Sequence, residues 1–241
     1  MKQSTNQLAE RQSSVLEAIV REYIRTAEPV GSLAVTERYD IAASSATIRN
    51  DMADLEDNGF IHQPHTSAGR VPTEKAYQYY VDNFLRDVDV PRQEEKALRQ
   101  LWSMDEMSRE ILKLTAKTVA SFSTESVFLA FDRHDVYYTG LANLFGQPEF
   151  VDQGQVQSVS VMIDRLDEAV ADIYHSLRGE VQVLIGQKHG FGRQCSVIVT
   201  TYQMPGAGLG IFGLLGPTRM DYDLNIARLK YVHSGVSSHN G

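Results

Sequence analysis

Hydrophobic residues in the first third of the chain recur every three or four positions, which is the spacing of amphipathic helices. This spacing predicts helices over residues 8–27, 32–39, 45–58 and 72–85. Ser32 is suited to cap the second helix, and Ser44 or Ser45 the third, because a hydroxyl can accept a hydrogen bond from a free amide of the first turn. Gly59 is suited to end the third helix.

Between the third and fourth helices, two short runs flank a polar loop. Phe60–Gln63 and Arg70–Val71 are predicted to pair as strands on either side of Pro64–Gly69. Three helices followed by a hairpin is the element order of a winged helix-turn-helix. We therefore expect a winged-helix DNA-binding domain over residues 1–87.

The rest of the chain predicts a mixed domain. A helical pattern covers 93–123, with a possible break at Ser103–Met107, and two more cover 163–177 and 222–233. Short apolar runs between them are typical of strands and lie at 127–131, 136–144, 181–185, 197–202 and 210–215. We expect an α+β protein in which 88–123 is a linker and connecting helix and 124–241 form the C-terminal domain.

The third helix carries the strongest functional signal. One face is apolar, and the opposite face carries small and polar residues that let a backbone approach a DNA groove. Arg49 can donate two hydrogen bonds to guanine, and Asn50 can pair with adenine. Hydroxyls near the helix N-terminus suit phosphate contacts and belong to Ser44, Ser45 and Thr47. The alternative is an ordinary solvated helix face.

The predicted hairpin loop is small, polar and weakly basic. We expect its DNA contacts from His65, Thr66 and Ser67, with Arg70 lying along a phosphate backbone or in a minor groove. His62 and His65 are interpreted as surface histidines and not as metal ligands, since no cysteine or carboxylate cluster accompanies them.

Charge and composition restrict these interpretations. The net charge is −8, and Met1–Val90 carry nine Lys/Arg against fourteen Asp/Glu, so a DNA-binding surface has to be local. Cys195 is the single cysteine and is expected to be a core residue. The sequence predicts no signal peptide and no membrane span, hence a cytoplasmic protein.

Several segments of the chain are more specific than a general helix-turn-helix pattern, namely residues 28–32, 44–52, 63–73, 140–144, 147–150 and 213–222. In these segments the chain resembles the HrcA family of heat-inducible transcription repressors. The resemblance implies a winged helix followed by a GAF-like domain, and a homodimer that represses chaperonin and DnaK operons in the stress response. It also implies an inverted-repeat operator in double-stranded DNA, and the chaperonin GroEL as a partner.

One departure from the family concerns an inserted dimerising segment. Only Asp132–Val136 stand where family members carry a long insertion, so we expect a reduced GAF-like domain. We still expect a homodimer, formed through the helical stretch Gln93–Ser123, which carries Leu98, Leu101 and Trp102, together with an exposed face of the C-terminal sheet. The alternative is that this apolar stripe docks the winged helix on its own C-terminal domain.

Catalytic and cofactor motifs were not found in the sequence. Gly206-x-Gly208-x-Gly210 precedes an apolar run instead of a helix, so it predicts a β-hairpin and not a dinucleotide site. We expect neither an enzyme nor a cofactor or metal. The competing hypothesis is a winged-helix regulator whose C-terminal domain binds a small molecule, which fold analogy alone supports only weakly.

Overall fold

The computed structural model describes residues 8–104, 106–150, 161, 163–174, 177, 181–186, 190–204 and 208–238. These form two compact units, Met1–Leu85 and Arg86–Gly241. The division falls close to the predicted end of the winged-helix domain at residue 87. Each unit has its own core and is described separately.

The first unit has the predicted element order of a winged helix-turn-helix. Its elements are α1 (Glu10–Thr26), α2 (Ser32–Arg38), α3 (Ser45–Asp57), β1 (Ile61–His62), β2 (Val71–Pro72) and α4 (Glu74–Asn83). β1 and β2 pair as antiparallel strands, with Ile61 opposite Pro72. The core is made by the apolar stripes that the periodicity indicated, including Leu16, Ile19, Ile48, Leu55 and Tyr80.

The ends of the helices follow the predicted capping with one correction. Ser44 caps α3, because its hydroxyl accepts from the amide of Thr47 at 3.1 Å. Gly59 adopts a positive φ of 72° just beyond the helix, which a glycine tolerates without strain. Ser32 is not a cap: Gly31 occupies that position, and the Ser32 hydroxyl lies 3.0 Å from that of Ser45. The two serines join α2 to α3.

A buried carboxylate, Glu22, stabilises the helical core of this unit. It accepts from Arg25 at 2.7 Å, and Arg38 and the Tyr39 hydroxyl also contact it. The hydrogen bond from Arg25 contributes most to holding the pKa of Glu22 below its ordinary value, although burial acts in the opposite direction. The charge therefore persists inside the unit because three donors surround it.

The second unit is built on a five-stranded antiparallel sheet in the order β4-β3-β7-β6-β5. Its strands are β3 (Ser126–Asp132), β4 (Asp135–Thr139), β5 (Gln182–Ile185), β6 (Cys195–Met204) and β7 (Gly208–Pro217). Its helices are α5 (Arg92–Trp102), α6 (Arg109–Phe122), α7 (Leu141–Phe145), α9 (Leu166–Tyr174) and α10 (Tyr222–Ser238), with a 3₁₀ turn at Pro148–Phe150. The expected α+β fold class is confirmed.

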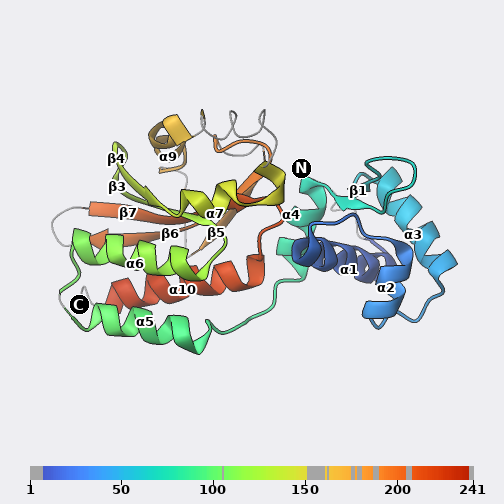
Figure 1. Ribbon diagram of the computed structural model, residues 1–241, viewed down its shortest axis with the longest axis horizontal. Helices are drawn as coiled ribbons and strands as arrows, with labels where there is room; N and C mark the ends of the chain where they lie inside the picture. Colours follow the sequence, from blue (N-terminus) through green and yellow to red (C-terminus); the bar gives the residue numbers. More distant parts are fainter. Residues whose placement is uncertain are drawn as a thin grey trace, which may run out of the picture. The chain divides into compact units, whose positions relative to one another are not determined.

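Helices cover both faces of this sheet. α5, α6 and α10 lie on one side, and α7 and α9 on the other (Figure 1). Side chains of β3 alternate between the two layers: Phe128 and Ala130 belong to the cluster under α9, which also holds Cys195. Burial raises the pKa of the Cys195 thiol to about 12, so it is the inert core residue that the sequence predicted.

One predicted element of this unit needs correction. The run 136–144 is not one strand, because Gly140 turns the chain with a φ of 75° and α7 begins after it. The expected break in the helical stretch 93–123 is confirmed, since α5 ends at Trp102 and α6 begins at Arg109. α5 packs on α6 and α6 packs on β3, so both helices belong to the second unit. The predicted hairpin after β6 is confirmed by the pairing of Met204 with Gly208.

β3 and β4 are joined by a tight turn. The Asp132 carboxylate accepts from the amides of His134 (2.7 Å) and Asp135 (3.0 Å), an arrangement that aspartate commonly makes at turns. The exposed Asp132 side chain thus has a structural role in this turn. No inserted segment separates the two strands.

The predicted dimer surface on α5 is wrong in its main residues. Leu98 is fully buried and Trp102 is 4% exposed, both within their own unit. The indole of Trp102 donates to the Thr115 hydroxyl of α6 at 3.0 Å and stacks on Tyr231 of α10 at 5.5 Å. This stripe is therefore core, and a dimer needs another surface.

A buried ion pair connects three helices of the second unit, α5, α6 and α10. The Arg228 guanidinium of α10 donates to both Glu94 oxygens of α5, at 3.0 and 3.1 Å, and to the Phe122 carbonyl at 2.8 Å. Glu125 and Asn225 are also fully or almost fully buried there. Burial raises the pKa of Glu94 and of Glu125, and the Arg228 charge opposes both shifts.

The family-like segments of the C-terminal domain meet in space. Arg219 contacts the Glu149 carboxylate and donates to the Gln147 side chain at 2.7 Å. The side-chain amide of Asn143 donates to the backbone carbonyls of Ala120 (2.7 Å) and Glu125 (3.0 Å). These polar residues fix turns around one end of the sheet, and their role in the described residues is structural.

Candidate nucleic-acid interface

α3 presents a face suited to entering a DNA groove. Ile48, Met52 and Leu55 are buried in the unit, as predicted. The opposite face is exposed and carries Ala46, Arg49, Asn50 and Ala53. The two alanines keep this side of the helix shallow beside the two long polar side chains. Arg49 and Asn50 are therefore placed where a groove floor could be reached.

Charges on α3 are arranged to reduce repulsion of phosphates. Arg49 is the single cation among its residues, against four carboxylates. Asp51 is buried and accepts from Arg11 at 2.7 and 3.0 Å, and Glu56 pairs with Arg70 at 2.9 Å. Two of the four negative charges of the helix thus have a cation beside them, which weakens their repulsion of phosphates locally.

The wing, residues 61–72, stands beside this helix. Its tip, from Pro64 to Ser67, is exposed, and the Ser67 hydroxyl lies 3.3 Å from Nδ1 of His65. The Gln63 side chain closes the loop by donating to the carbonyls of Thr66 (3.0 Å) and Ala68 (2.8 Å). A compact loop with exposed polar side chains at its tip is suited to lie on a sugar-phosphate backbone.

A groove of about 460 Å³ runs between the wing, α2 and α3. Its walls include Arg49 from the helix, Thr66 and Ser67 from the wing tip, and Leu33 from α2. Leu33 is 60% exposed. Sequence periodicity did not identify it as a groove residue, because a single exposed leucine is common and its neighbours in space are not visible in the sequence.

The predicted contact residues divide into two groups. Ser44, Arg49, Asn50, His65, Thr66 and Ser67 are exposed. Ser45, Thr47 and Arg70 are only partly exposed. Ser45 is directed to Ser32, and Arg70 to Glu56. Of the first group, Arg49, Thr66 and Ser67 line the groove. All three members of the second group have partners inside the domain, since the Thr47 hydroxyl lies 2.9 Å from that of Ser44.

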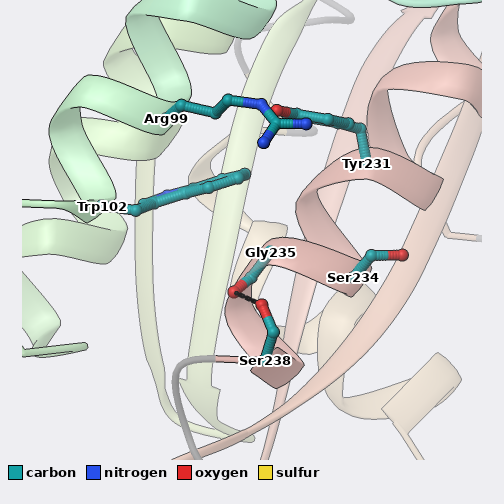
Figure 2. A pocket seen from close by; sticks show the side chains of 6 residues that line it. All are labelled: Arg99, Trp102, Tyr231, Ser234, Gly235 and Ser238. Carbon is teal, nitrogen blue, oxygen red and sulfur yellow. Dashed lines mark hydrogen bonds between the residues drawn. The ribbon is translucent and has the colours of Figure 1, made fainter.

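A second cavity, in the C-terminal unit, bears on the small-molecule hypothesis. It has a volume of about 450 Å³ and is lined by residues of α5 and α10 (Figure 2). Two of its polar side chains already have partners: Arg99 pairs with Glu95 at 2.8 Å, and the Ser238 hydroxyl donates to the Gly235 carbonyl at 3.0 Å. These contacts give no specific support for a ligand.

Within the described ranges, no group of three or more His, Cys, Asp and Glu side chains is arranged to hold a metal ion. Likewise, none of the helices among these residues combines the length and apolar character needed to cross a bilayer.

The fold and the exposed helix face define a winged-helix protein with an appended α+β domain. The family model described as the HrcA protein C-terminal domain matches residues 72–226. The chain belongs to the HrcA family.

Relatives extend the match to the winged helix. The heat-inducible transcription repressor HrcA of Carboxydothermus hydrogenoformans is 27% identical, with 95% of this chain and 97% of the relative covered. The protein of the same name from Brevibacillus brevis gives the same identity and coverages. A crystal structure of a hypothetical protein, with a TM-score of 0.77 and 22% identity, covers 97% of this chain and 98% of its own and shows the same fold.

The alignment with the Carboxydothermus protein also measures the shortening. It spans 331 positions, whereas 95% of this 241-residue chain is about 229 residues. About 100 aligned positions therefore have no residue here, the difference between those two lengths. A gap of this size agrees with the tight β3–β4 turn at the point where the sequence suggested a missing insertion.

Proposed function

We propose that this chain is a sequence-specific DNA-binding repressor of heat-shock chaperone genes, including the chaperonin and DnaK operons. The observation that carries the proposal is the exposed face of α3, with Arg49 and Asn50 between two alanines and beside an ordered wing. The printed name of its relatives, heat-inducible transcription repressor, supports the same conclusion. The operator is an inverted repeat, and the protein acts in the cytoplasm.

In this proposal α3 is the recognition helix and lies in the major groove. Arg49 and Asn50 read base edges, because both side chains can make two parallel hydrogen bonds to one base. Ser44 and Thr47 contact phosphates near the helix N-terminus, where the helix dipole favours anions. His65, Thr66 and Ser67 of the wing contact the neighbouring backbone. Ser45 has the weakest claim, since its hydroxyl faces Ser32.

Replacing Arg49 tests the base-reading role. We expect Arg49→Ala to weaken operator binding by about 1–3 kcal/mol and to relax the preference at one base pair. Arg49→Lys keeps the charge but not the planar fork, so it should lose the base preference while keeping the salt dependence. Fluorescence anisotropy on duplexes with each base pair substituted measures both. Equal losses on operator and random DNA would remove Arg49 from the base-reading set.

The proposed assembly is a homodimer. A palindromic operator presents two half-sites related by a two-fold axis, and one helix per protomer can read only one of them. GroEL as a partner rests on the family resemblance alone. The experiment that tests the function as a whole is a comparison of operator and scrambled duplexes with the purified chain.

A further inference from the structure

The wing is attached to the recognition helix through one acidic side chain. Glu56 lies in the last turn of α3. Its carboxylate accepts a hydrogen bond at 2.9 Å from the backbone amide of Gln63, which follows β1 on the outgoing side of the wing. On the returning side, Nε of Arg70 lies 2.9 Å from the second Glu56 oxygen. One carboxylate therefore holds both sides of the wing to the helix.

Burial and backbone pairing restrict the contacts that the Arg70 side chain can make outside the domain. Its side chain is only 18% exposed, and its Nε is buried without a hydrogen bond, so Glu56 interacts with it mainly as a charge. Its backbone is also fixed, because its amide and carbonyl pair with Val30 at 2.8 and 2.9 Å. A cation held in this way is poorly placed to reach a phosphate.

The neighbouring backbone leaves the wing little freedom. A Cβ at Gly69 would lie 2.5 Å from the Val30 carbonyl carbon and 2.6 Å from backbone atoms of Pro29. The returning side of the wing therefore packs against the segment that precedes α2. The position of the tip is set by contacts at the base: the strand pairing, the Gly69 approach and the Glu56 carboxylate.

From these contacts we propose that Glu56 and Arg70 are positioning residues that set the angle of the wing to the recognition helix. DNA contact is left to the wing tip at His65, Thr66 and Ser67. The inference rests on the proposed DNA-binding function, and it replaces the sequence-based expectation that Arg70 itself holds the DNA backbone. In this proposal the negatively charged Glu56 side chain is required for tight binding of DNA, although DNA is itself negatively charged.

The sign of one substitution tests this proposal. Glu56→Gln removes a negative charge close to the proposed DNA surface, so electrostatics alone predicts tighter binding. Positioning predicts the reverse, a roughly 5- to 50-fold loss on the operator, since residues in one network commonly couple by such factors. Asp57→Asn is the matched control: it removes an equal charge from the next residue, which is exposed, and should bind as tightly as wild type or tighter.

Arg70→Ala gives an independent readout. A lost phosphate contact would lower the slope of log affinity against log salt by about 0.9. A positioning residue should leave that slope unchanged while affinity falls, and the Glu56→Gln, Arg70→Ala double variant should bind no worse than the weaker single variant. Circular dichroism and thermal melts show whether each variant remains folded.

The outcomes separate the inference from the function on which it rests. If wild type prefers no operator over scrambled DNA, the proposed function fails before any variant is compared. If wild type is specific but folded Glu56→Gln binds as tightly as the Asp57→Asn control, the positioning role is overturned. A salt slope that falls by one contact in Arg70→Ala would overturn it as well.

Discussion

Replacing Arg228 by alanine is expected to destabilise the C-terminal unit by about 3–5 kcal/mol, the usual cost of removing one partner of a buried ion pair. Its partner Glu94 is fully buried, and the buried Glu125 lies in the same network. Without the guanidinium, two carboxylates remain in the core with no cation in contact. Phe122 also loses the donor to its carbonyl.

The loss should depend on pH in a defined direction. Burial raises the folded-state pKa of both carboxyl groups, and Arg228 opposes this rise in wild type. In the variant both groups therefore hold their protons to higher pH when folded than when unfolded. Stability gained from the protonated forms is present at acid pH and is lost as pH rises through the folded-state pKa values. The difference from wild type should therefore grow as the pH rises above the ordinary Glu pKa of about 4.3.

The unfolding of the C-terminal unit can be measured separately from that of the winged helix. Trp102 is the single tryptophan of the chain and is buried in this unit, so its fluorescence follows the unfolding there. Glu95→Ala is the matched control, because this residue adjoins Glu94 but forms a solvent-accessible pair with Arg99. We expect it to change stability by less than about 1 kcal/mol. Equal effects of the two variants would contradict the assignment of Arg228 to a buried network.

The second large effect concerns the two halves of the operator. A homodimer should bind the complete inverted repeat about 10²- to 10⁴-fold more tightly than a single half-site, because the second recognition helix binds as part of the same molecule. The acidic composition strengthens this expectation: with fourteen acidic and nine basic residues over Met1–Val90, one domain has little general attraction to DNA. Two helices acting together compensate for the weak single contact.

Titration of labelled half-site and full-site duplexes measures this ratio. Sedimentation of the free protein at micromolar concentration shows whether the dimer exists before DNA is added. A spacer lengthened by about half a helical turn, which places the half-sites on different sides of the duplex, is the control and should remove the advantage. A monomer that binds both duplexes equally well would exclude the dimer and would indicate that the shortened C-terminal domain no longer assembles.

Much of the winged helix was predictable because its signals are local. Apolar spacing, the Ser44 cap and the Gly59 stop depend on neighbours within a few positions, and the structure places all three as expected. The exposed side of α3 followed from the same periodicity. Local rules were insufficient at Ser32, where Gly31 takes the cap and the serine hydroxyl instead pairs with Ser45.

The remaining features depend on contacts between distant positions. An amphipathic stripe shows that Leu98 and Trp102 are covered, but not by what, and their cover is α6 and α10 rather than a second protomer. Glu94 and Arg228 are 134 positions apart, so nothing local marks them as partners. The ion pair between Arg70 and Glu56 has no sequence signal either, because the two residues are 14 positions apart and meet only when the wing folds back on α3.

The most direct test of the account is a comparison of specific and non-specific DNA at physiological salt. The full-length chain is titrated into a labelled duplex carrying the inverted repeat found upstream of chaperonin genes, and into a scrambled duplex of equal length and composition. The account predicts a preference for the inverted repeat of at least about 10³-fold, in the range of specific repressors. Equal affinity for the two duplexes would contradict it.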